Sequence, residues 1–185
     1  NDEESNHRFS LWYHPIYTNG IHPDARFPRD RYTKLLEKLK NPEHSNKFII
    51  QQPTEASRNE LILAHDPCYV DNFLNQNLTE KEIKRIGLTP WTPQIVPRTL
   101  LLMGGAIAAL DHVMEHGGIA GNMAGGTHHA HHDFGSGYCI FNDLAVCSLL
   151  ALSKYDVTKI AVVDFDVHQG DGTATILQNV DKVLT

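Results

Sequence analysis

The sequence has no apolar run that approaches the roughly 18 residues needed for a membrane-spanning helix. Its first ten residues are polar and lack the apolar stretch of a signal peptide. Only three cysteines are present, Cys68, Cys139 and Cys147. Their odd number and the lack of CxxC spacing argue against a disulfide framework and against a zinc finger. We therefore expect a cytoplasmic protein of a reducing compartment that does not associate with a membrane.

Basic residues are few and dispersed. Sixteen Lys and Arg against 22 Asp and Glu give a formal net charge of −6, without a dense basic block. Binding nucleic acid through many phosphate contacts needs such a block, so no direct nucleic-acid partner is expected. The 41% hydrophobic and 21% charged residues are typical of a globular protein. Without a repeat or linker, the pattern predicts a polar extension over 1–10 and one domain over 11–185.

Alternating helical and strand patterns predict an α/β protein with a parallel sheet and helices on both faces. Helices are expected at 29–40, 67–74 with Asp66 as cap, 79–86, 98–116, 143–154 capped by Asn142 or Asp143, and 173–179. Strands are expected at 11–16, 48–51, 160–163 and from 183 onward. The apolar run 160–163 is typical of a strand buried on both faces. Gly104-Gly105 would let another element approach closely, and the proline-containing segment 87–97 is expected to be an irregular loop.

Asp164, Asp166 and His168 follow the last apolar strand at alternate positions. In extended backbone such side chains point to the same side, and open α/β sheets bind ligands at the carboxyl ends of their strands. Carboxylate and imidazole groups suit zinc or another divalent transition metal. The alternative is a strand that simply ends in polar residues, with one Asp capping the next helix.

Four of the twelve histidines lie between residues 128 and 132. The adjacent His128 and His129 follow Gly125-Gly126 and could both face one cavity as general base and acid, if Asp164 and Asp171 orient their rings. The alternative is a solvated, His-rich loop or an adventitious metal site, and that interpretation is favoured for His131 and His132.

Gly137 and Tyr138 offer flexible backbone and an aromatic ring that could line a narrow channel. Without the other motifs, Tyr138 would more simply be a core residue.

Three segments together resemble the histone deacetylase family of the arginase/deacetylase fold: Ala124–Ala130 (AGGTHHA), Gly137–Asp143 (GYCIFND) and Val163–Gly172 (VDFDVHQGDG). Their order and spacing also agree with that family. Four further segments are similar to bacterial and class IV-like members: Tyr13-His14-Pro15, Arg26-Phe27-Pro28, His65-Asp66-Pro67 and Pro90-Trp91. The likeness therefore runs from about Leu11 to the end. The resemblance implies a three-layer α/β sandwich.

The resemblance also implies a site. Asp166 and His168 would be ligands of one zinc ion, and His128 and His129 would be the catalytic pair, supported by Asp164 and Asp171 respectively. Gly137 and Tyr138 would line the acyl channel. The implied reaction is hydrolysis of an acylated lysine in a protein, or of an acylated small amine, by a metal-activated water with His129 as general base.

Family members continue beyond the position of Thr185, and that part supplies a third metal ligand and an oxyanion-stabilising Tyr. The chain is therefore interpreted as the N-terminal portion of a deacetylase domain, with an apolar sheet edge and face left exposed near Val183. The alternatives are an arginase-type ureohydrolase with two manganese ions, and a non-catalytic module that binds acyl-lysine or a partner protein. The residues predict neither the acyl length nor the oligomeric state.

Overall fold

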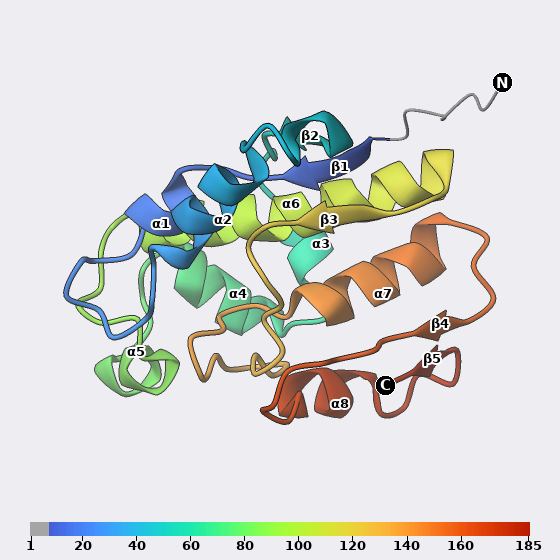
Figure 1. Cartoon of the computed structure of the whole chain (residues 1–185). Helices are drawn as coiled ribbons and strands as arrows, with labels where there is room; N and C mark the ends of the chain where they lie inside the picture. Colours follow the sequence, from blue (N-terminus) through green and yellow to red (C-terminus); the bar gives the residue numbers. More distant parts are fainter. Residues whose placement is uncertain (1–7) are drawn as a thin grey trace, which may run out of the picture.

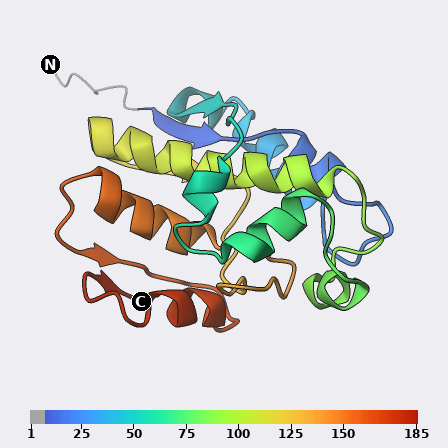
Figure 2. The same cartoon turned by 180° about the vertical axis from the view of Figure 1, so that it is seen from behind.

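The computed structural model describes residues 8–185, and these form an α/β fold with two small parallel sheets (Figures 1 and 2). The first sheet has the order β2-β1-β3, from Phe48–Gln51, Phe9–Trp12 and Ala120–Asn122. Leu11 of β1 pairs with Ile50 of β2 and with Gly121 of β3. The second sheet pairs β4 (Ile160–Ala161) with β5 (Val183–Leu184). The predicted fold class, α/β with parallel strands and several helices, is confirmed.

Two long helices connect these sheets. The helix α6 (Ile95–His116) packs on β1 and β3, and α7 (Asp143–Lys154) packs on α6. Both views place α7 between α6 and the β4–β5 pair, with α8 (Asp171–Leu177) beside that pair (Figures 1 and 2). The other helices are α1 (Ile16–Asn19), α2 (Arg31–Leu39), η1 (Ser45–Lys47), α3 (Arg58–Leu61), α4 (Pro67–Leu74) and α5 (Glu80–Ile86).

Local capping signals set the ends of several helices. Asp66 accepts a hydrogen bond from the Tyr69 amide, and Pro67 occupies the first helical position of α4, as predicted. Thr79 and Glu82 form a capping box at the start of α5. Gly87 ends that helix at φ +83°, a backbone conformation that favours glycine. The sequence therefore defines these helices locally.

The core lies where α6 passes the first sheet and the α3–α4 region. Its largest fully buried side chains include Tyr17, Phe73 and Phe141. Gly104 is essential to this packing because a Cβ there would overlap the Thr54 carbonyl oxygen, and one at Gly105 would lie 2.6 Å from the Tyr17 hydroxyl. The predicted close approach at Gly104-Gly105 is confirmed.

Several predicted boundaries were wrong. β1 begins at Phe9 and ends at Trp12, so residues 13–16 are not strand. Residues 1–7 of the predicted polar extension lie outside the described residues. Helix α6 begins at Ile95 and includes Pro97 in its first turn, where proline is tolerated because the N–H has no intrahelical partner there. Helix α8 begins at Asp171, two residues before its predicted start.

The strand predicted at 160–163 is shorter and more exposed than expected. β4 comprises only Ile160–Ala161, and Val163 is 68% exposed. Burial on both faces was wrong because, among the described residues, β4 pairs with β5 alone. The predicted exposure of an apolar face near Val183 is confirmed, since Leu184 of β5 is 73% exposed. Among residues 8–185, no helix has the length and apolar character required to cross a membrane.

Candidate active site

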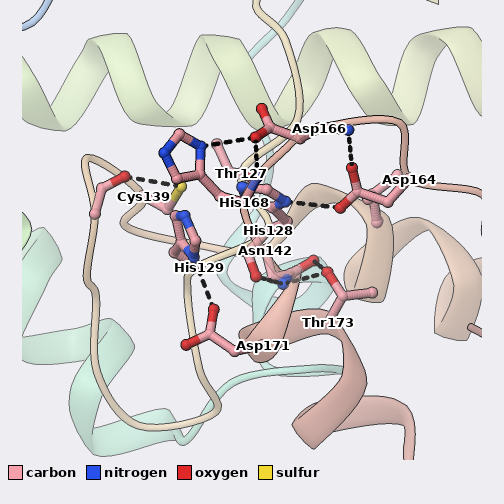
Figure 3. Close-up of polar contacts among 12 residues, drawn as sticks. Thr127, His128, His129, Cys139, Asn142, Asp164, Asp166, His168, Asp171 and Thr173 are labelled. Carbon is pink, nitrogen blue, oxygen red and sulfur yellow. Dashed lines mark hydrogen bonds and ion pairs between the residues drawn. The ribbon is translucent and has the colours of Figure 1, made fainter.

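The adjacent histidines lie in the long loop between β3 and α7, and each is hydrogen-bonded to one aspartate (Figure 3). The Nδ1 atom of His128 is 2.7 Å from Oδ2 of Asp164, and Nδ1 of His129 is 2.7 Å from Oδ1 of Asp171. The two ring centroids are 4.1 Å apart. His128 is buried, whereas the His129 side chain keeps 24% exposure. The structure thus forms both His–Asp pairs that the resemblance implied.

These contacts shift the carboxylates toward the charged state. The hydrogen bond from His128 lowers the pKa of Asp164, and the bond from the Asp166 amide adds to this. Partial burial acts to raise the pKa of Asp171, but the bond from His129 and the charges of His129 and His131 outweigh it, so the pKa is lowered. An ionised carboxylate accepts a hydrogen bond from the ring nitrogen that carries the proton, here Nδ1. The other ring nitrogen, Nε2, is then free to accept a proton.

Asp166 and His168 are hydrogen-bonded to each other and are not part of a larger group of potential metal ligands among the described residues. Oδ1 of Asp166 is 2.8 Å from both the backbone nitrogen and Nδ1 of His168. The hydrogen bond from the His168 amide, followed by that from its ring, lowers the pKa of Asp166. Both side chains are about half exposed or more, at 49% for Asp166 and 72% for His168. Within residues 8–185, no group of three or more His, Cys, Asp or Glu could hold a metal ion.

The expected common orientation of Asp164, Asp166 and His168 was wrong. Strand β4 ends at Ala161, and Oδ1 of Asp164 accepts a hydrogen bond from the Asp166 amide. This local side-chain bond competes with extended backbone and bends the segment. Asp164 therefore points to His128, while Asp166 and His168 face a neighbouring cavity (Figure 3).

A cavity of about 870 Å³ brings most of the predicted site residues together. His128, His129, Gly137, Tyr138, Asp166 and His168 all line it, whereas Asp164 and Asp171 lie behind the two histidines.

Gly137 and Tyr138 form part of the cavity wall, and Tyr138 is 39% exposed, which contradicts the core alternative. Both have positive φ, at 53° and 68°, and the Tyr138 amide donates to the Ile86 carbonyl oxygen. The Tyr138 ring lies edge-on to Phe27, with the centroids 5.3 Å apart.

The solvated-loop interpretation of the other two histidines was wrong for His131. Its ring stacks on Phe134, with centroids 4.4 Å apart, and its side chain is only 16% exposed. His132 is exposed, but its Nδ1 lies 2.8 Å from the Ala64 carbonyl oxygen. Both rings thus help to fix the loop.

Comparison with known proteins assigns this chain to a family. The model of the histone deacetylase domain matches residues 25–185. The chain belongs to the histone deacetylase family. An uncharacterized protein of the cyanobacterium Picosynechococcus is 41% identical over 177 residues, which are 96% of this chain and 58% of that protein. Histone deacetylase 8 of Arabidopsis thaliana is 31% identical over 184 residues, 96% of this chain and 47% of that protein.

The architecture of the histone deacetylase domain is matched as well. The crystal structure of the HDA15 HD domain superimposes with a TM-score of 0.80 at 19% sequence identity. The match covers 97% of this chain and 52% of that one. The chain thus spans about half the length of the relatives it matches.

The sequence analysis missed several buried polar residues around the site of this histone deacetylase domain. Asn142 and Asp143 were considered as alternative helix caps and as part of a family motif, and His65 only as part of the family likeness. Thr127, in the His-rich loop itself, donates to Asp143, and the Thr173 amide donates to the His128 carbonyl oxygen. A polar residue that follows Phe141 and is fully buried must find partners, but the sequence does not show which ones.

Proposed function

We propose that this histone deacetylase domain is part of a zinc-dependent deacylase that hydrolyses the amide of an acylated lysine or of a small acylated amine. One observation carries the proposal: two adjacent imidazoles, each hydrogen-bonded through Nδ1 to a carboxylate, line the same cavity as Asp166 and His168. Such pairs are typical of general acid–base catalysis.

The donor chemistry of Asp166 and His168 fits zinc. Oδ1 of Asp166 and Nδ1 of His168 are 2.8 Å apart, and carboxylate oxygen and imidazole nitrogen are both common zinc ligands. Catalytic zinc sites usually have three protein ligands, and the described residues hold two. When bound, zinc would polarise the amide carbonyl and lower the pKa of a water molecule.

The residues of the chain would then move the proton. His129 is the proposed general base because its ring is partly exposed in the cavity wall, and Nδ1 is occupied by Asp171. Its Nε2 would accept the proton of the attacking water and later donate it to the leaving amine nitrogen. Asp171 would stabilise the charged ring between these steps. The more buried His128, paired with Asp164, would, when protonated at Nε2, stabilise the negative charge that develops on the carbonyl oxygen.

The experiment uses the native-length protein, loaded with zinc. It measures release of the acyl group from acyl-lysine peptides, from an acylated polyamine and from an acetyl ester. His129→Ala is expected to lower kcat by about 10²–10⁴-fold, the usual contribution of a general base. His112→Ala on α6 is a matched control, because His112 does not line the cavity. No hydrolysis of any substrate by the zinc-loaded protein, or full activity of His129→Ala, would refute the proposal.

A non-catalytic acyl-lysine binding module would instead bind the peptide without turnover. The predicted cytoplasmic location belongs to the same proposal and is tested by cell fractionation.

A further inference from the structure

The two residues that flank the histidine pair are both held by the start of helix α7. On one side, Oδ1 of Asp143 accepts hydrogen bonds from the Thr127 amide at 2.9 Å and from the Thr127 hydroxyl at 2.8 Å. The Asp143 amide in turn donates to that hydroxyl at 3.0 Å. Asp143 is only 7% exposed. Three hydrogen bonds therefore tie Thr127, directly before His128, to the first residue of the helix.

On the other side, Asn142 holds the segment that follows the pair. Its Nδ2 donates to the Ala130 carbonyl oxygen at 3.1 Å. It also donates to the Thr173 hydroxyl at 3.0 Å (Figure 3). Its Oδ1 accepts from the Ala145 amide and so caps α7. Asn142 is fully buried. One side chain thus connects the loop, the helix α7 and the start of α8, which also carries Asp171.

The third part of this arrangement is His65, which fixes Asn142 from behind. The backbone N–H of Asn142 donates to Nε2 of His65 at 2.9 Å. Nδ1 of His65 must therefore carry the proton, and it donates to the His132 carbonyl oxygen at 3.2 Å. The His65 ring has no exposure and packs 5.1 Å from the Phe141 ring. A single neutral tautomer therefore satisfies both contacts.

We propose that Asn142 and Asp143 are positioning residues for His128 and His129, with His65 holding Asn142 in place. This inference rests on the proposed function, because it assigns the two residues to the same site. Neither residue acts on the substrate.

The aspartate partners of the two rings are more exposed than the contacts to α7. The side chains of Asp164 and Asp171 are 30% and 45% exposed. Asp164 also lies in an irregular segment whose Val163 and Phe165 side chains are largely exposed. The contacts to α7, by contrast, come from the buried Asn142 and Asp143. A displacement of reacting groups by about 1 Å can lower the rate about 100-fold.

The test separates positioning from helix capping. Asn142→Ser keeps a good helix cap but is too short to reach Ala130, so kcat is expected to fall about 10–100-fold with KM and zinc content unchanged. Ser57→Ala is the matched control: it removes the cap of α3, which lies away from the cavity. That variant is expected to lower Tm by a few degrees and to keep kcat.

A second pair of variants tests the other anchor. Asp143→Ala is expected to lower kcat to a similar extent, and Asp143→Asn should recover much of it, because an amide oxygen can still accept the Thr127 hydrogen bonds. This pair carries the test if Asn142→Ser does not fold.

A spectroscopic readout separates failure of this inference from failure of the proposed function. The imidazole resonances of His128 and His129 in ¹H–¹⁵N spectra of the zinc-free protein should shift or broaden in Asn142→Ser and Asp143→Ala. They should be unchanged in Ser57→Ala. Unchanged resonances in the first two variants, or wild-type kcat in an active enzyme, would overturn the positioning role. An inactive wild type with shifted variant resonances would refute only the deacylase proposal.

Discussion

The neutral His65 ring is expected to make the free energy of unfolding depend on pH. Burial lowers the pKa of His65 from 6.5 to about 4, and the nearby His132 ring adds to this, although backbone hydrogen bonds oppose it. An exposed histidine in the unfolded chain titrates near its ordinary pKa of about 6.5. Between these two values only the unfolded state binds the proton, so falling pH favours unfolding.

The size of the effect follows from the two pKa values. At pH 7 the linkage contribution of His65 is close to zero, and by pH 5 it destabilises the folded state by about 2 kcal/mol. It levels off near 3 kcal/mol once the pH is below about 4, where both states are protonated. The variant His65→Gln removes the titration and keeps a polar side chain. Its unfolding free energy should therefore vary less with pH than that of the wild type.

The assay is urea unfolding of both proteins at pH 7 and pH 5. The change in unfolding free energy between the two pH values is compared in the wild type and the variant. The difference between these changes cancels the contributions of the other histidines and of the carboxyl groups, whatever the absolute stability of the variant. The wild type should lose about 2 kcal/mol more than His65→Gln between these pH values. An equal loss in both proteins would refute the argument, as would an imidazole resonance of His65 that titrates near pH 6.5.

Three further predictions concern packing, charge and exposed surface. Gly104→Ala should lower the unfolding free energy by about 1–3 kcal/mol in urea unfolding, because the methyl group would overlap the Thr54 carbonyl oxygen. A stability gain, as expected from helix propensity alone, would contradict this. Asp171→Asn should lower kcat by about 10²–10⁴-fold with KM unchanged in steady-state assays, because His129 loses its charged partner; wild-type kcat would exclude that role. Leu184→Thr should reduce dye binding and aggregation of the 185-residue chain without lowering its urea midpoint, and unchanged aggregation would show that this side chain is not responsible.

The sequence predicted features that depend on neighbouring residues along the chain. Asp66-Pro67 and the capping residues Thr79 and Glu82 specify helix starts through contacts within four residues. The strand at 48–51 was predicted with its observed bounds for a similar reason, since apolar residues there follow one another between polar segments. The family motifs likewise placed both His–Asp pairs before the fold was known.

Features that depend on distant partners could not be predicted. The burial of a strand depends on which strands and helices cover it, so the apolar sequence at 160–163 did not reveal that Val163 is exposed. The alternation of Asp164, Asp166 and His168 failed because one local hydrogen bond bends the chain. The second role of Asn142 needs the Ala130 carbonyl oxygen, which only the folded loop brings near.

The separation of each histidine from its carboxylate along the chain has a consequence for synthesis. Asp164 follows His128 by 36 residues, and Asp171 follows His129 by 42. A ribosome adds that many residues in roughly 2–8 s. During this interval the nascent chain carries both imidazoles without the carboxylates to which they are hydrogen-bonded in the folded chain. The two His–Asp pairs form only when the segment that carries Asp164 and Asp171 docks, and a histidine resonance could therefore report this step of folding.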